Sequence, residues 1–340
     1  MAVHTLAQSR TIYSPQKPVT ILNGSGTELS NLQQNKNKAK RKTITQTIML
    51  ALIDIAKEHK HFELMQSYWN TYHCQSHIQS YNKKTFGKYC KNRHCTHCCA
   101  IRKANIINRY YPILKNWNDA YFVTLTSRAV KAHNLKRNID GTLRAFRKIK
   151  DRFRKRNERG NGFNLVGIKS LECNFNATKK TYNPHLHLIV QTEEMANLLI
   201  NEWLAIWTKE HTHIVAQDKR PINDLEHCLI EIIKYGSKIF TEPDIKKKKT
   251  SKVPPKIYAN ALHNIFYAMK GIRIFDRFGF NLQKQMKVKN QKTFTKDYQN
   301  WHFDLKLNDW YNFETGELLT NYKCSNELDY LLQNMELNIC

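Results

Sequence analysis

Apolar positions recur with two different periods along the chain, and the change of period predicts the order of helices and strands. Apolar residues at three- and four-residue intervals over 44–72 predict a helix, and "AIRKANIINRYYPILKNW" predicts a second one. "DAYFVTLTSRAV" is rich in β-branched and aromatic residues, which predicts a strand. A long helix follows, with Leu143, Phe146, Ile149 and Phe153 on one apolar stripe.

The middle of the chain predicts an α+β fold. "NLVGIKSLECNFN" and "PHLHLIVQT" indicate two antiparallel strands separated by a longish loop. A helix over 193–210, a short strand "THIVAQ" and a helix "INDLEHCLIEIIKYGSK" complete the series. The order β-α-β-β-α-β is typical of a ferredoxin-like, or RRM-like, unit: a central antiparallel sheet with helices on one face. Its other face is free to hold a site.

Composition and charge indicate a polyanionic partner. The 340 residues are 41% hydrophobic, enough for one large domain or two small ones, and 55 Lys and Arg against 28 Asp and Glu give a net charge of +27. Nucleic acid is the commonest polyanion for such a protein, and an acidic membrane surface is the alternative. The sequence shows neither an apolar run long enough to span a bilayer nor a signal-peptide core. We therefore expect a cytoplasmic protein without membrane partners.

Shifts in composition predict five segments. Residues 1–43 are polar and indicate a flexible basic arm, and 44–117 form a helical segment with a zinc knuckle. Residues 118–240 form the sheet-containing core. Residues 241–290 contain a basic linker, "DIKKKKTSKVPPK", and a helix that packs back on the core. The role of 291–340 stays open.

A group of cysteines precedes the core. Cys90, Cys95 and Cys98 contain a Cys-x-x-Cys, the spacing with which two thiolates grip one tetrahedral Zn²⁺. Free buried thiols and redox chemistry are the alternatives. A structural zinc site in a reducing compartment is the interpretation we favour.

Two histidines on one predicted strand indicate a second metal site. His185 and His187 flank a single leucine, so both imidazoles emerge on the same face of the strand. If the preceding hairpin turns near 178 and 179, Glu172 lies opposite His185 and shares that face. Two imidazoles and a carboxylate suit a divalent cation with open positions. The alternative is that the histidines face solvent or are structural.

A tyrosine near the end of the core is a candidate nucleophile. Glu231 and Tyr235 are four residues apart and therefore neighbours on one face of the predicted helix 223–238. Gly236 is a plausible helix stop, which leaves the tyrosine at an exposed end. A tyrosine hydroxyl can attack phosphorus when a metal withdraws charge from the phosphate. Against this, most of the 16 tyrosines are ordinary core or surface residues.

Three motifs in order resemble a known family. "YFVTLTS", "NPHLHLIV" and "EIIKYGSK" resemble the motifs of the rolling-circle replication initiators of bacterial plasmids, in the HUH endonuclease superfamily. With "CKNRHCTHC" upstream, the chain is most similar to the large Rep group with a Cys-rich N-terminal segment. The resemblance covers about residues 74–285 and implies that the ferredoxin-like unit is an HUH palm.

The resemblance also implies roles for single residues. His185 and His187 match the histidines that bind Mg²⁺ or Mn²⁺, and Tyr235 matches the tyrosine that nicks one strand at the double-strand origin. That step leaves a 5′-phosphotyrosine link and a 3′-OH primer. Glu231 matches a glutamate that activates water in the termination step. Glu172 as third metal ligand is an inference from the hairpin.

The family pattern bears on the zinc knuckle as well. The family tends to have a cysteine near the position of Cys74, which makes it the preferred fourth zinc ligand. Four other residues remain alternatives for this position: His77, His94, His97 and Cys99. In "CTHCC" the chain departs from the family, which commonly has proline after the second cysteine of the Cys-x-x-Cys.

The implied partner is plasmid DNA, presented as a single strand or a hairpin at the origin, with host helicase and polymerase as protein partners. Basic side chains expected to hold the DNA backbone are Arg147, Arg152, Lys155, Lys234 and Lys238. The nine Lys or Arg between 144 and 159 also fit an ordinary solvated helix face. An HUH transposase or relaxase, or a non-catalytic zinc-containing DNA-binding regulator, are the alternatives. The oligomeric state stays open.

Overall fold

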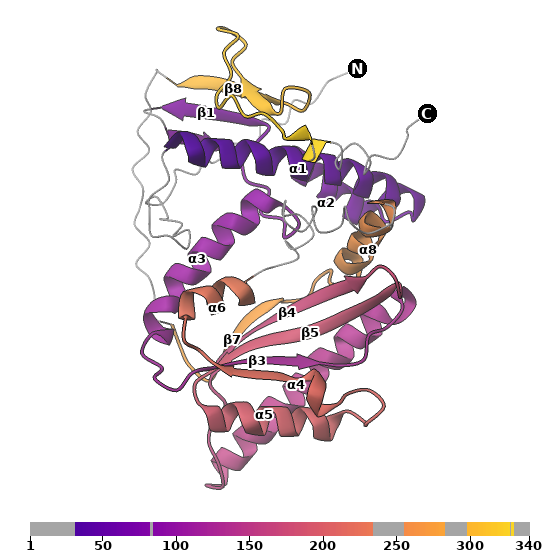
Figure 1. Cartoon of the computed structure of the whole chain (residues 1–340), viewed down its shortest axis with the longest axis vertical. Helices are drawn as coiled ribbons and strands as arrows, with labels where there is room; N and C mark the ends of the chain where they lie inside the picture. The colour runs from indigo at the N-terminus through magenta and orange to yellow at the C-terminus, as the bar shows by residue number, and fades with distance from the viewer. Residues whose placement is uncertain (1–30, 82–83, 234–254, 283–297, 327, 330–340) are drawn as a thin grey trace, which may run out of the picture.

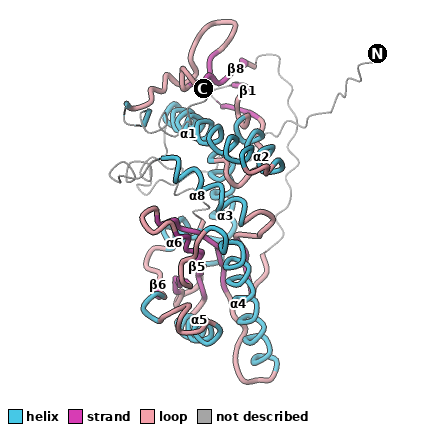
Figure 2. Tube along the Cα trace, turned by 90° about the vertical axis from the view of Figure 1, so that its right-hand side faces the viewer, coloured by secondary structure: helices cyan, strands magenta, loops and turns pink. Residues whose placement is uncertain are grey.

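The computed structural model describes residues 31–81, 84–233, 255–282, 298–326, 328 and 329. These residues form two antiparallel sheets with helices around them (Figure 1). The sheets lie toward opposite ends of an elongated molecule, with helices α3 (Thr96–Leu114) and α8 (Pro255–Ala268) between them in both views (Figures 1 and 2). Among the described residues, no helix is both long and apolar enough to cross a bilayer.

The larger sheet has five strands in the order β6-β3-β5-β4-β7. In chain order its elements are β3 (Tyr121–Thr126), α4 (Ala132–Glu158), β4 (Gly167–Asn176), β5 (Thr181–Val190), α5 (Glu193–Ile206) and β6 (Asp218–Pro221), with β7 (Phe275–Phe278) added at the edge. The first and third strands of the β-α-β-β-α-β series pair in the centre. This is the ferredoxin-like arrangement, as the sequence predicts.

Side-chain alternation gives the larger sheet two different faces. Leu186 and Leu188 of β5 are fully buried and belong to the same core as the apolar stripe of α4. Lys169 of β4 points to this side too, because its ammonium lies 5.7 Å from the ring of Phe146 on α4. His185 and His187 alternate with the leucines and lie on the other face. Figure 1 shows α4 and α5 on one side of the sheet and α6 (Leu225–Ile232) on the other.

The smaller sheet has four strands in the order β2-β1-β8-β9 and packs beside the N-terminal helices. Its strands are β1 (His77–Tyr81), β2 (Lys84–Gly87), β8 (Gln299–Asp304) and β9 (Asp309–Tyr311). Ile78, Trp301 and Trp310 form a buried cluster with Ala39 of α1 (Asn31–Glu58). Segments from both ends of the described chain therefore share one small core. The sequence prediction contained neither this sheet nor β7.

The N-terminal boundaries differ from those expected. Residues 31–43 are helical instead of part of a flexible arm, and residues 1–30 lie outside the described residues. The polar sequence misleads because Lys42, although fully buried, donates three hydrogen bonds through its ammonium, to Tyr72 O, Cys74 O and Ser76 Oγ. Paired in this way, a lysine can lie inside a protein.

The single helix expected over 44–72 is two helices, α1 and α2 (Phe62–Tyr72). The break falls at Lys60, whose φ of +57° is left-handed and cannot continue a right-handed helix. α1 and α2 then pack on each other and on α8 in a second core.

Three further expectations are wrong in detail. "THIVAQ" is not a strand: Ile214–Ala216 form a 3-10 turn, and β6 follows at Asp218. The β4–β5 loop is short, since β4 ends at Asn176 and β5 begins at Thr181. The segment 261–275 begins as helix but ends in β7. The basic linker expected from residue 241 lies mostly outside the described residues.

Candidate metal and DNA-processing site

The β4–β5 hairpin brings the predicted carboxylate to the two histidines. Glu172 pairs directly with His185 across the antiparallel ladder, as a turn centred at 178 and 179 requires. Thr124 of β3 pairs with His187 from the other side. Side chains directly opposite each other share a face, so three adjacent strands contribute to one cluster.

The ligand atoms of this cluster converge. His185 Nε2 lies 3.1 Å from His187 Nε2, and Glu172 Oε2 lies 3.2 Å from His187 Nε2 and 3.9 Å from His185 Nε2. All three side chains are buried. With the Nε2 atoms turned toward the carboxylate, the Nδ1 atoms face outward. His185 Nδ1 donates to Asn183 O at 2.9 Å, and His187 Nδ1 lies 3.2 Å from Thr124 Oγ1.

This geometry fits a divalent cation. Two ligands at right angles and about 2.1 Å from an octahedral ion lie about 3.0 Å apart, close to the spacing of these atoms. Metal-binding histidines usually donate their second N–H to a carbonyl or another oxygen. Here the Nδ1 of His185 donates to a carbonyl, and the Nδ1 of His187 has a hydroxyl oxygen within hydrogen-bond distance. Two imidazoles and a carboxylate on one face leave positions for water or a phosphate oxygen. The group therefore has the donors and the outer contacts of a metal site.

Contacts on the same face connect the cluster to α6. The ring of Phe122 lies 5.4 Å from that of His187, and the Arg220 guanidinium lies 4.6 Å from the Phe122 centroid. Arg220 also donates to Glu231 Oε2 at 2.6 Å. This series of contacts fixes Glu231 of α6 on the metal side of the sheet. Tyr235, Lys234 and Lys238 lie outside the described residues.

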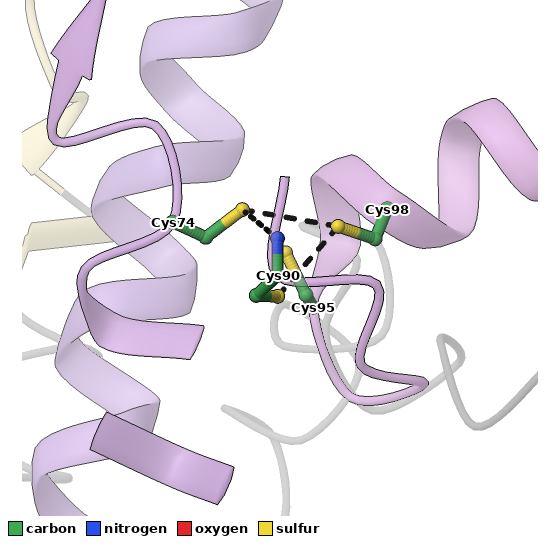
Figure 3. Close-up of side chains that lie close together, drawn as sticks. All are labelled: Cys74, Cys90, Cys95 and Cys98. Carbon is green, nitrogen blue, oxygen red and sulfur yellow. Dashed lines mark hydrogen bonds between the residues drawn. The ribbon is translucent and has the colours of Figure 1, made fainter. Parts of the chain in front are cut away.

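Four cysteines form a second group of converging ligand atoms. Cys74 precedes β1, Cys90 follows β2, and Cys95 and Cys98 lie at the start of α3. Figure 3 shows their side chains turned toward one another. The Sγ atom of Cys98 lies 3.8 Å from that of Cys74 and 3.6 Å from that of Cys90.

These distances fit a tetrahedral zinc site. Two sulfurs bound to one Zn²⁺ at about 2.3 Å in tetrahedral geometry lie about 3.8 Å apart. Hydrogen bonds among the thiols lower the pKa of Cys90 and Cys98 and raise the pKa of Cys74 and Cys95, so the four thiols share protons that a bound metal would displace. The backbone N–H groups of Cys90 and Lys91 also donate to Sγ atoms of the group.

Three of the four rivals for the fourth position have other contacts. His94 Nε2 lies 3.1 Å from Ser67 Oγ, Cys99 donates to Arg93 O, and the ring of His77 contacts that of His302. Neither these residues nor His97 belong to the converging group. Cys74 belongs to the converging group, and its role as the fourth zinc ligand stays a prediction. Sequence reasoning missed Lys42, whose ammonium holds the Cys74 carbonyl at 2.7 Å.

The basic residues of α4 differ in their surroundings. Arg152 and Arg156 both contact the carboxylate of Glu202 on α5, so Arg152 takes part in an ion pair between two helices. Arg147 and Lys155 are exposed. All of them lie on the helix that covers the face opposite His185 and His187. Their contact with DNA stays a prediction.

Comparison with known proteins identifies the family. A model of the Rep_1 family, described as replication protein, matches residues 81–327, more than half of the chain. The chain therefore belongs to this family of replication proteins, in agreement with the resemblance to plasmid replication initiators. No solved structure matches the chain significantly.

Curated relatives carry the same description. The chain is 29% identical over 167 residues to a protein described as "Protein rep" from Staphylococcus aureus, covering 44% of this chain and 69% of the relative. It is 30% identical over 146 residues to a "Protein rep" from Bacillus sp and 29% identical over 146 residues to one from Bacillus amyloliquefaciens. Those matches cover 40% of this chain, and 45% and 40% of the relatives, so the chain spans less than half of their length.

Proposed function

We propose that this replication protein initiates rolling-circle replication of a plasmid by nicking one DNA strand at the double-strand origin. The observation that carries the proposal is the convergence of His185, His187 and Glu172 on the face of the ferredoxin-like sheet opposite α4 and α5. A divalent cation, Mg²⁺ or Mn²⁺, bound there supplies a Lewis acid for the scissile phosphate. The net charge of +27 favours a DNA substrate.

Tyr235 is the proposed nucleophile. Its hydroxyl loses a proton and attacks phosphorus, and the bond between phosphorus and the 3′ oxygen breaks. The products are a 5′-phosphotyrosine link to the protein and a free 3′-OH that primes synthesis by host polymerase, after unwinding by a helicase. The strand must be unpaired, or extruded as a hairpin, to reach the site.

Glu231 is the proposed base for termination. Its carboxylate accepts a hydrogen bond from Arg220, which itself contacts Phe122 beside His187. These contacts support the proposal because they hold the carboxylate on the same face of the sheet as His187, and from there we propose that it directs water at the regenerated junction. A second tyrosine is then unnecessary for release.

The four cysteines are proposed to hold a structural Zn²⁺. Such an ion ties the β1–β2 hairpin to the start of α3, because Cys74 and Cys90 flank the hairpin and Cys95 and Cys98 begin the helix. All four positions are thiolates, so the ion has no open position for substrate.

The experiment uses a supercoiled plasmid that carries the gene and its flanking DNA, with Mn²⁺. Wild type is expected to convert it to the nicked form, whereas Tyr235→Phe and Glu172→Gln are not. Glu210→Gln, a change at an exposed glutamate, is the matched control and is expected to nick like wild type. No nicking by wild type with any divalent cation would favour a zinc-containing DNA-binding regulator.

A further inference from the structure

Within the described part of the chain, one face of the four-stranded sheet packs on α1 and the other carries no covering helix (Figure 1); we call the second the open face. Strand alternation turns Ile78, Trp301 and Trp310 toward α1, where they are buried. The residues between them point away from α1. Figure 1 shows this sheet on the far side of α1 from the five-stranded sheet. The open face is therefore separate from the cluster of His185 and His187.

Aromatic rings gather on this face in two groups. In the first, the His302 ring lies 4.2 Å from that of Phe313, which lies 4.5 Å from that of Tyr311. In the second, the Tyr298 ring lies 5.5 Å from that of Tyr81 and 6.0 Å from that of Phe86. We call these six side chains the aromatic face: Tyr81, Phe86, Tyr298, His302, Tyr311 and Phe313.

The strand register places the four strand residues of the aromatic face on one side, and ring contacts join Tyr298 and Phe313 to them. His302 of β8 pairs with Tyr311 of β9. Gln79 lies on the same face of β1 as Tyr81. It pairs with Phe86 of β2 on one side and with Asn300 of β8 on the other. Gln79 donates to Asn300 at 3.1 Å, so a polar amide pair lies between the two aromatic groups. Phe313 is 64% exposed, which is unusual for a phenylalanine that only stabilises a fold.

The charge on the β1–β2 side of the aromatic face favours an anion, whereas the β8–β9 side also carries acidic residues, with exposed Glu314 directly after Phe313. Residues 64–118, which contain β1 and β2, have nine Lys or Arg and no Asp or Glu. Exposed Lys84 pairs with Tyr81 and so lies on the same side of the sheet. Proteins that bind single strands combine aromatic side chains, which stack on the bases, with basic side chains, which contact the phosphates. This sheet has both kinds of side chain.

We propose that the aromatic face binds unpaired DNA by stacking bases on its rings. Duplex DNA fits less well, because bases within a stacked duplex present their edges in the grooves and not their ring faces. This second surface would hold a single strand away from the nicking site. It goes beyond the proposed function and does not depend on Tyr235.

The test measures binding of fluorescein-labelled 20-nucleotide oligo(dT) by anisotropy, with the full chain carrying Tyr235→Phe so that no cleavage occurs. Phe313→Ala is expected to weaken binding about fivefold or more, and Phe313→Trp to restore it. Phe62→Ala is the matched control, because Phe62 is a 62% exposed phenylalanine of α2. It should bind like its parent. A 20-base-pair duplex should be bound equally by all variants.

Two results would overturn the proposal. One is equal affinity of Phe313→Ala and its parent for oligo(dT), with or without a lower melting temperature. Unchanged affinity together with a lower melting temperature would mean that the ring of Phe313 packs against another part of this chain. The other is an equal loss for single strand and duplex, which would indicate duplex contact.

Photo-crosslinking supplies a readout that needs no variant. Oligo(dT) containing 5-iododeoxyuridine is expected to crosslink to peptides that contain Tyr311, Phe313 or His302. Crosslinks confined to other peptides would contradict the proposal. Since neither measurement uses nicking, a failure of the endonuclease proposal would leave their results readable.

Discussion

Glu172 Oε2 lies 3.2 Å from His187 Nε2, across two neighbouring strands of one hairpin. The contact joins residues 15 positions apart, and a four-residue turn fixes it, because any change in loop length would shift the register. A one-residue shift would turn the carboxylate to the helix-covered face. The candidate metal site is thus a direct product of strand pairing.

Replacing this carboxylate should weaken metal binding. Glu172→Gln keeps the shape of the side chain but removes its negative charge, so we expect Mn²⁺ affinity to fall by more than about tenfold, the loss that an outer contact alone can cause. Isothermal titration calorimetry with Mn²⁺ measures this affinity. Unchanged affinity, with Glu210→Gln as the reference, would exclude Glu172 as a ligand.

The hydroxyl of Thr124 should support His187 from outside the ligand set. With Nε2 on the metal, Nδ1–H donates to Thr124 Oγ1, so Thr124→Val leaves a buried N–H without this acceptor. We expect about tenfold weaker Mn²⁺ binding in Thr124→Val. Thr124→Ser retains the hydroxyl and should bind Mn²⁺ as wild type does; equal losses in both variants would point to packing instead.

The neighbouring cysteines 98 and 99 allow a matched test of zinc. Cys98→Ser removes a member of the converging group, whereas Cys99 donates to Arg93 O and lies outside it. Elemental analysis is expected to find one zinc per chain in wild type and Cys99→Ser, and less in Cys98→Ser, with a lower melting temperature. Zinc retained fully in Cys98→Ser would contradict the proposed ligand set.

His263 should make stability depend on pH. Its buried ring contacts Tyr68 and His61, and burial lowers its pKa to about 4, with smaller contributions from His61 and His59. Between about pH 6.5 and 4 the unfolded chain therefore binds a proton that the folded chain does not, so stability falls as pH falls.

Thermal unfolding at pH 7 and pH 5 measures this effect. From pH 7 to pH 5, the melting temperature of wild type should fall further than that of His263→Gln. His133→Gln, a change at an exposed histidine, should follow wild type. Identical losses in wild type and His263→Gln would show that His263 does not carry the pH dependence.

The sequence was sufficient for the parts of the molecule that local pattern determines. Alternation placed His185 and His187 on one face, and hairpin symmetry placed Glu172 opposite them. The small sheet could not be found in this way, because β1 pairs with β8 more than two hundred residues later. Buried Lys42 was equally invisible, since only the tertiary fold supplies the carbonyl oxygens that it contacts.

The most direct test of the central proposal is to identify the protein–DNA bond itself. Protein is incubated with its plasmid and Mn²⁺, digested with nuclease and protease, and examined by mass spectrometry for a nucleotide-linked peptide. The account predicts a 5′-phosphotyrosine on Tyr235, and none in Tyr235→Phe. A nicked plasmid with the adduct on another residue, or with no adduct, would contradict it.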